Sequence, residues 1–124
     1  MSWKIEHRPS QDIVTITAEG AISAEDVFAQ VDESVALVKA TFALGSLVDY
    51  SNAVLGMPVA DISRLPDMFT AQGLPRRTKI AVVLPADPEN MHKYTFFDDV
   101  ASNNGYRVKL FWEPTRAMAW LSDG

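Results

Sequence analysis

The sequence predicts an α/β domain with a mixed, mostly parallel sheet and an N-terminal hairpin, in the order β-β-α-β-α-β-α-β-α. The main observation is that strand-like segments alternate with amphipathic helical segments along the chain. A second is the segment 80–84, which is apolar on both faces, like a central parallel strand. A third is an alternating strand over 106–112, followed by a short helix with one apolar face. Strands separated by helices pair in parallel through right-handed crossovers.

The first 20 residues are expected to form the hairpin. Apolar and polar residues alternate over 3–8, which predicts a strand with one covered face. Residues 9–12 are of types that favour a turn, and residues 13–18 are mostly β-branched and alternate, as in a strand. Gly20 is expected to end that strand.

A helix is expected next, with Ser23 as its N-cap. Glu25 and Asp26 lie in its first turn, where carboxylates complement the helix dipole. Its apolar residues form one stripe: Val27, Phe28, Val31, Val35 and Val38. Leu37 lies off this stripe and is expected to be exposed or to cover a neighbouring element.

The middle of the chain predicts a short strand over 45–50, followed by a polar corner at 49–52. Apolar residues then recur at helical spacing over 59–69. Pro66 lies inside this pattern, so the helix is expected to be kinked there or to begin near it. Gly73 ends the segment.

The buried strand at 80–84 is followed by Asp87-Pro88-Glu89, which combines a capping carboxylate, a proline and an acid, as at a helix start. The helix is expected to turn Tyr94, Phe97, Val100 and Ala101 inward. Asn103-Asn104-Gly105 supplies a left-handed stop. In the final helix Ala117, Trp120 and Leu121 share one face, and Trp112 before it is expected to share the buried face of its strand.

Composition limits the classes of function. The 124 residues predict a single domain, 1–124, and the 48% apolar and 22% charged content is that of a globular protein. The formal charge of −5 argues against non-specific binding to nucleic acid or anionic membranes. The chain has no cysteine and no apolar run long enough to span a membrane. We expect a cytoplasmic protein without cofactors.

The pattern resembles the SpoIIAA-like superfamily, which includes the STAS domains. The resemblance lies in the segments Ala18-Glu19-Gly20 with Ser23-Ala24-Glu25-Asp26, Val48-Asp49-Tyr50-Ser51, the strand from Lys79 to Pro85, and the ending Val108-Lys109-Leu110-Phe111 with Ala117, Trp120 and Leu121. It covers nearly the whole chain. The nearest branch is the STAS/SEC14-related group of small, stand-alone bacterial domains. The resemblance implies a non-enzymatic module that binds a partner or a ligand.

One departure concerns phosphorylation. Antagonists of the phosphoswitch type have an Asp-Ser-Ser-Gly-like loop at the start of the second helix. Residues 52–63 contain no such motif, and Ser63 is expected inside a helix. The chain is therefore not expected to be a phosphorylated switch.

Two groups of residues are candidates for a site. Open α/β sheets bind ligands beyond the carboxyl ends of their strands, where the polar corner and the next helix start would meet. The polar candidates are Asp49, Tyr50, Ser51, Asn52 and Asp87. The alternative is that these side chains only complete a turn and cap a helix. The apolar candidates are Leu55, Met57 and Phe69, which would line a groove or belong to the core.

Other patterns have simpler explanations. Glu89 and His92 have the spacing of a carboxylate-bridged metal pair, but such sites need a second pair, so no metal site is predicted. Arg76, Arg77 and Lys79 form a basic cluster, which is best explained as a solvated loop. No Gly-x-Ser-x-Gly motif indicates a hydrolase.

Three hypotheses follow. The leading one is a SpoIIAA-like domain that binds an unknown protein partner or a second copy of itself, with a regulatory role. The alternative is a carrier or sensor of a small hydrophobic, lipid-like ligand, held in a groove between the helices at 59–69 and 91–101. The third is an enzyme that uses Asp49 or Asp87 as a base.

Overall fold

The computed structural model of the protein describes residues 2–86 and 90–123. Its strands are β1 (Ser2–Arg8), β2 (Ile13–Ile22), β3 (Gly45–Leu55), β4 (Lys79–Val83) and β5 (Arg107–Phe111). Its helices are α1 (Ala24–Thr41), α2 (Val59–Ile62), α3 (Leu65–Ala71), α4 (Met91–Asn103) and α5 (Pro114–Ser122).

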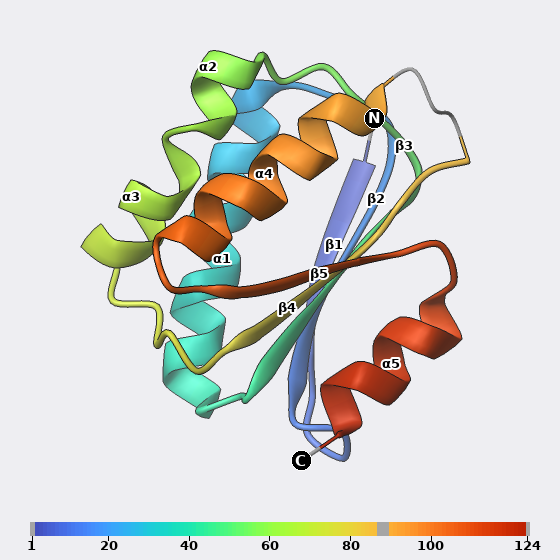
Figure 1. Ribbon diagram of the computed structural model, residues 1–124. Helices are drawn as coiled ribbons and strands as arrows, with labels where there is room; N and C mark the ends of the chain where they lie inside the picture. Colours follow the sequence, from blue (N-terminus) through green and yellow to red (C-terminus); the bar gives the residue numbers. More distant parts are fainter. Residues whose placement is uncertain (1, 87–89, 124) are drawn as a thin grey trace.

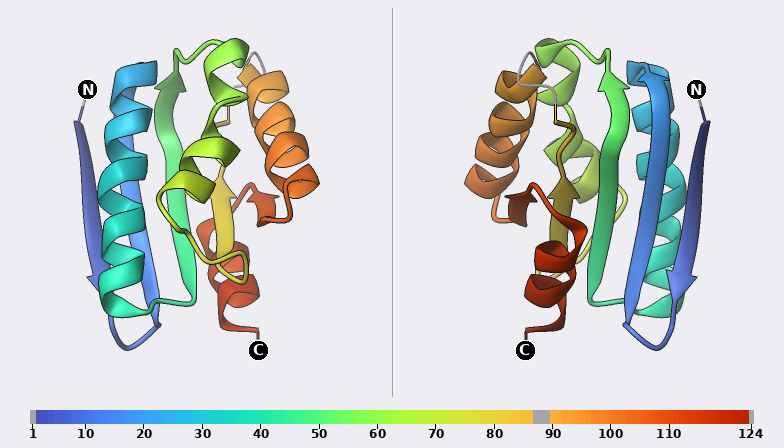
Figure 2. Two further views of the ribbon diagram at one scale, coloured as in Figure 1. Left: turned by 90° about the vertical axis from the view of Figure 1, so that its left-hand side faces the viewer. Right: turned by 90° about the vertical axis from the view of Figure 1, so that its right-hand side faces the viewer.

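The strands form one sheet in the order β1-β2-β3-β4-β5, as Figure 1 shows. β1 and β2 are an antiparallel hairpin, and every later neighbour pair is parallel. The predicted class, an α/β domain with a mixed and mostly parallel sheet, is therefore confirmed. Figure 2 shows that α1, α2, α3 and α4 cover one face of the sheet, whereas α5 lies on the other.

The two faces have separate apolar cores. The larger core lies beneath α1–α4, and the smaller one lies between the sheet and α5, around Ala117. β4 contributes to both, because Ile80 and Val82 face the larger core while Ala81 and Val83 face the smaller one. The prediction of a strand that is buried on both faces is confirmed.

The predicted N-cap of the first helix is also confirmed. Ser23 Oγ accepts a hydrogen bond from the backbone N–H of Asp26, whose carboxylate accepts one from the N–H of Ser23. This reciprocal pair is a capping box, which fixes the start of α1. Leu37 is half-buried and packs against the larger core, one of its two expected alternatives. The helix ends at Phe42, which has a left-handed backbone, with φ 58°.

Two strands are longer than the sequence predicted. β2 continues past Gly20 to Ile22, and β3 continues from Tyr50 to Leu55, so the expected polar corner at 49–52 is wrong. The physical reason is that the two strands support each other: the parallel ladder extends to the pair Ile22–Leu55. The ladder is irregular at the polar residues, because its register shifts between the pairs Thr17–Asp49 and Glu19–Asn52.

The second helix is interrupted, as the position of Pro66 predicted. α2 has only four residues, and Pro66 occupies the first turn of α3. Ser63 is the C-cap of α2, so the expectation that it lies inside a helix was wrong. Its Oγ donates a hydrogen bond to the Ala60 carbonyl over 2.6 Å.

Near the C-terminus, the helix stop at Gly105 is confirmed by its left-handed φ of 87°. Trp112 is 59% exposed, so the expectation that it is buried was wrong. It lies beyond the last residue of β5 and therefore outside the packed ladder.

The predicted helix start at Asp87-Pro88-Glu89 lies outside the described residues. No described helix has the length and apolar character that a membrane crossing requires.

Candidate functional site

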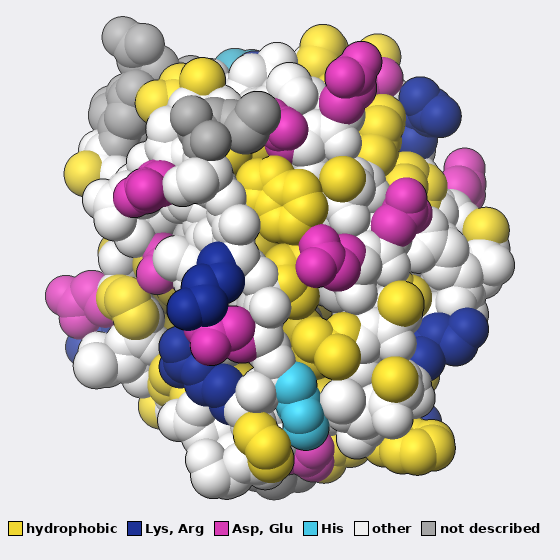
Figure 3. Space-filling view, turned by 180° about the vertical axis from the view of Figure 1, so that it is seen from behind, with side chains coloured by type: hydrophobic (Ala, Val, Ile, Leu, Met, Phe, Trp, Pro, Cys, Tyr) yellow, Lys and Arg dark blue, Asp and Glu magenta, His cyan; other side chains and the backbone are white. Residues whose placement is uncertain are grey.

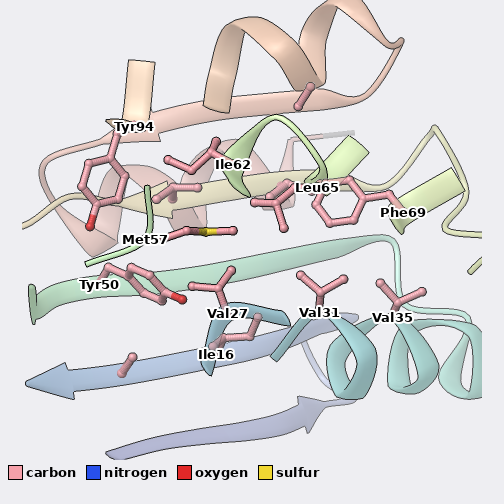
Figure 4. Packing of buried hydrophobic residues seen from close by; sticks show 14 of the residues in the cluster. Ile16, Val27, Val31, Val35, Tyr50, Met57, Ile62, Leu65, Phe69 and Tyr94 are labelled. Carbon is pink, nitrogen blue, oxygen red and sulfur yellow. The ribbon is translucent and has the colours of Figure 1, made fainter. Parts of the chain in front are cut away.

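A cavity lies between the sheet and the helices α1–α4, in the larger core. Its volume is about 100 Å³, and its lining is almost entirely apolar. Figure 4 shows Val27, Val31 and Val35 of α1 on one side of this space and Met57, Leu65 and Phe69 on the other. Cavities of this size are unusual in small domains, because protein interiors are close-packed.

The spacing of α1 explains its contribution. Val27, Val31 and Val35 are separated by four residues, so they stack along one face of the helix and point to the sheet. Valine has a short side chain that does not reach across the gap. On the opposite wall, α2 ends at Ile62 and α3 begins at Leu65, so Ser63 and Arg64 separate the two short helices. One continuous helix would place other side chains along this wall.

The cavity has a polar end, formed by Gln30, Tyr50 and Tyr94. All three are lining residues and at most 5% exposed. The Tyr50 hydroxyl donates a hydrogen bond to Gln30 Oε1. Figure 4 shows Tyr50 and Tyr94 at the same end of the apolar cluster.

Two polar atoms at this end have no partner among the residues that the structure describes: Gln30 Nε2 and the Tyr94 hydroxyl. Thr78 Oγ1 is a third atom of the cavity lining that has no partner in the described part of the chain. A buried polar group without a partner costs about 1–3 kcal/mol, so such groups are rare in folded proteins. The residues that carry these three atoms line the same cavity.

The two phenols at the polar end are neutral at ordinary pH. Burial raises the pKa of Tyr50, and the nearby Tyr94 raises it further, although the hydrogen bond to Gln30 opposes this. Burial likewise raises the pKa of Tyr94. A cation lies close by: Lys93 lines the cavity, and its Nζ donates a hydrogen bond to the Leu55 carbonyl over 3.0 Å.

The structure separates the predicted site residues into two groups. Tyr50, Leu55, Met57 and Phe69 all line the cavity. Asp49 faces away from it, because adjacent residues of a strand point to opposite faces of a sheet.

On that other face, Asp49 Oδ1 accepts hydrogen bonds from Ser51, through its backbone N–H at 3.0 Å and its hydroxyl at 2.7 Å. Asn52 is exposed and borders a shallow, open depression with Ser2 and Glu19. Of the polar candidates, Tyr50 therefore lies with the apolar ones, whereas Asp49, Ser51 and Asn52 are apart from the cavity. Asp87 lies outside the described residues.

The sequence reasoning missed Gln30 and Tyr94 as site residues. Tyr94 was expected to point inward, but only as a core residue. Gln30 had a detectable signal: it lies three residues after Val27 and one before Val31, so it belongs to the inward face of α1. A glutamine inside an apolar stripe is unusual, because burying its amide needs partners on every side.

Two residues of the basic cluster, Arg76 and Lys79, have structural partners. Arg76 Nε donates to the Asn104 carbonyl over 3.0 Å, and its guanidinium lies 4.8 Å from the centre of the Tyr106 ring. Lys79 Nζ donates to the Trp120 carbonyl over 2.9 Å. Across the described ranges, no group of three or more acidic or imidazole side chains is arranged to hold a metal ion.

The fold has counterparts among solved structures, although no family model matches the chain and no curated protein matches its sequence. SpoIIAA, an anti-sigma factor antagonist, in its unphosphorylated form is 13% identical, with 97% of both chains covered and a TM-score of 0.55. An uncharacterised DUF3478-family protein from Shewanella loihica PV-4 is 16% identical, with 97% of this chain and 92% of that chain covered and a TM-score of 0.56. The Bacillus cell fate determinant SpoIIAA in its phosphorylated form is 11% identical, with 97% and 99% covered and a TM-score of 0.53.

The chain therefore has the SpoIIAA-like fold, the fold that the sequence resemblance implied. The likeness extends over nearly the whole length of each structure. At 11–16% identity it shows the fold alone, because one fold can support unrelated activities.

Proposed function

We propose that this chain is a binding domain that acts without catalysis, and that its cavity holds a small, uncharged, mostly apolar molecule. The observation that supports this best is the apolar cavity that has, at one end, polar atoms of Gln30 and Tyr94 without a partner among the described residues. An apolar space with a few convergent polar groups is the usual form of a small-molecule site. The domain would act as a carrier or a sensor of that molecule.

The volume limits the size of the ligand. An apolar cavity of about 150 Å³ binds benzene, so about 100 Å³ suits a short chain of a few carbon atoms. A long lipid tail exceeds this volume unless α2 and α3 move away from the sheet. In place of the lipid-like ligand expected from the sequence, we therefore propose a short-chain molecule.

The polar end favours a neutral head group with a carbonyl or hydroxyl oxygen. Within the described part of the chain, Gln30 Nε2 is a donor without an acceptor, and the Tyr94 hydroxyl can either donate or accept. A carboxylate would bring an unpaired charge into an apolar space, at a high cost in free energy. Lys93 is the nearby cation, but its Nζ is already bonded to the Leu55 carbonyl.

A titration of the ¹⁵N-labelled protein with propanamide, 1-propanol and propanoate tests the proposal by NMR. We expect saturable shifts at the amides of Val31 and Phe69 with the first two compounds, and weaker binding of propanoate. Val31→Phe fills the cavity and should abolish the shifts. Ala36→Phe, on the exposed side of the same helix, is the matched control. Asp49→Asn, on the other face of the sheet, should also leave them unchanged.

Saturable shifts that persist unaltered in the Val31→Phe variant would place binding elsewhere. The absence of saturable shifts with any of the three compounds would contradict the proposal directly. A preference for propanoate would instead mean that Lys93 binds the head group, and it would contradict the proposal of an uncharged head group.

A second candidate function is binding of a protein partner, with a regulatory role. SpoIIAA, whose fold this chain shares, is described as an anti-sigma factor antagonist. The specific observation in this chain is an exposed apolar pair after α1, where Phe42 is 76% and Leu44 52% exposed. Two large apolar side chains so close together on a surface are typical of an interaction site.

Affinity capture from the source cell tests this second candidate. A protein that is retained by the wild-type chain and by Ala36→Ser, but lost with Phe42→Ser/Leu44→Ser, would support it. Equal capture by all three chains would exclude this pair as the contact. Circular dichroism of each variant establishes that it is folded.

A further inference from the structure

β1 is an edge strand, so one side of its backbone has no partner strand within the sheet. Figure 3 looks at the molecule from behind, onto the side on which β1 lies. An exposed strand edge is a template for pairing with another strand, and proteins usually protect it with charges, bulges or cover. The side chains of β1 show which strand would fit.

The two sides of β1 have different chemistry. Trp3, Ile5 and His7 are half-buried and alternate with exposed Lys4, Glu6 and Arg8. The first three lie opposite Ala18, Ile16 and Val14, which belong to the larger core beneath α1. Figure 3 shows apolar side chains along this side of the molecule, next to alternating basic and acidic ones.

We propose that β1 pairs antiparallel with β1 of a second copy of this chain, with Ile5 opposite Ile5. In this register all seven residues of β1 have a partner. The two sheets then join into one continuous sheet of ten strands, twice the five of one copy. This pairing is independent of the cavity and of the function proposed for it.

The charges of β1 select this register. With Ile5 at the centre, Lys4 lies opposite Glu6 of the second copy, and the symmetry makes this pair twice. A shift that centres the pairing on Lys4 or on Glu6 places like charges directly opposite each other. Opposite charges across neighbouring strands stabilise a sheet, and like charges destabilise it. In one copy, Lys4 Nζ and Glu6 Oε1 already lie 3.5 Å apart on an exposed surface, where such a pair contributes little.

The apolar side fits the same register. Trp3 would lie opposite His7 of the second copy, and the two Ile5 side chains would meet at the centre. Trp3 and Ile5 already pack against the larger core, so pairing would extend that apolar layer from one copy to the next. Covering their exposed parts adds apolar burial to the new backbone hydrogen bonds.

Sedimentation equilibrium tests the proposal with charge reversals. We expect a concentration-dependent dimer for the wild-type chain. Lys4→Glu and Glu6→Lys each turn two attractive cross-strand pairs into repulsive ones, and should weaken the dimer about tenfold or more. Lys109→Glu, on the exposed part of the other edge strand β5, is the matched control and should leave the dimer unchanged.

Mixing the variants gives the decisive result. The Lys4→Glu chain has an acidic edge and the Glu6→Lys chain a basic one, so an equimolar mixture should form a heterodimer more readily than either chain alone. The double variant Lys4→Glu/Glu6→Lys restores complementarity and should dimerise like the wild type. A wild-type chain that stays monomeric at millimolar concentration would overturn the proposal. A dimer whose dissociation constant neither charge reversal changes would also overturn it.

Discussion

At the scale of single residues, the polar end of the cavity is the least expected feature of the molecule. Gln30 uses one of its two polar atoms to bind the Tyr50 hydroxyl, and the other has no partner among the described residues. The same volume filled with apolar side chains would avoid this cost. Residues that lower stability in a buried position are typical of a binding site, where a ligand supplies the missing partner.

A paired substitution at this end tests that reasoning. Gln30→Met/Tyr50→Phe removes the hydrogen bond and the unpaired amide together. We expect the free energy of unfolding, measured with urea, to equal or exceed that of the wild type by up to about 1 kcal/mol. Binding of propanamide should weaken in the same variant. A loss of more than about 2 kcal/mol would show that the cluster is needed for the fold.

The buried phenols predict a pH dependence. Burial raises the pKa of Tyr94 above its ordinary value, so the native state retains a proton that the unfolded state loses. Stability from this source is therefore present below about pH 10 and declines as the pH rises above it. In Tyr94→Phe the alkaline decline should be shallower, with no loss of stability at pH 7. Urea unfolding at pH 7, 9, 10 and 11 measures this, and identical pH profiles would contradict it.

At the scale of elements, α1 shows which signals in the sequence determine structure. Its start could be predicted because the capping box is local, from Ser23 to Asp26. Its end could not, because Phe42 occupies a left-handed position that glycine usually fills. β3 was predicted too short for a different reason. Its continuation depends on β2, a neighbour that local patterns do not include.

The end of α1 gives a prediction at this scale. Phe42 is strained at φ 58° and 76% exposed, so its side chain contributes little to the folded state. Phe42→Gly should therefore raise the free energy of unfolding by about 0.5–1 kcal/mol, because glycine adopts this conformation without a steric cost. Chemical denaturation measures the change. Lower stability would mean that the ring makes contacts that stabilise the fold.

At the scale of the whole molecule, the sequence predicted the topology, but for the cavity it indicated only a groove between the helices at 59–69 and 91–101, without α1 or the sheet. The order of the elements followed from alternating periodicities, and the buried strand β4 from its two apolar faces. The cavity is a property of packing between α1, α3 and the sheet, so no single segment indicates it. Met57 and Phe69 were recognised as candidates because they are apolar in a connecting region. Gln30 was not, because its partner Tyr50 is 20 residues away in the chain.

The two cores of the sheet also predict how local stability is distributed. β4 is central and buried on both faces, whereas α2 has four residues and no side-chain cap at its start. Amides of β4 should exchange with solvent only through global unfolding, while those of α2 should exchange through local opening. Native-state hydrogen exchange measures both. Protection of α2 equal to that of β4 would mean that the wall of the cavity does not open separately.

A crystal structure of the protein soaked in propanamide tests the proposed ligand site most directly. We expect density for one molecule in the cavity, with its carbonyl oxygen within hydrogen-bond distance of Gln30 Nε2 and its chain directed toward Phe69. An empty cavity at saturating propanamide, or a molecule bound only on the outer surface, would contradict the proposal.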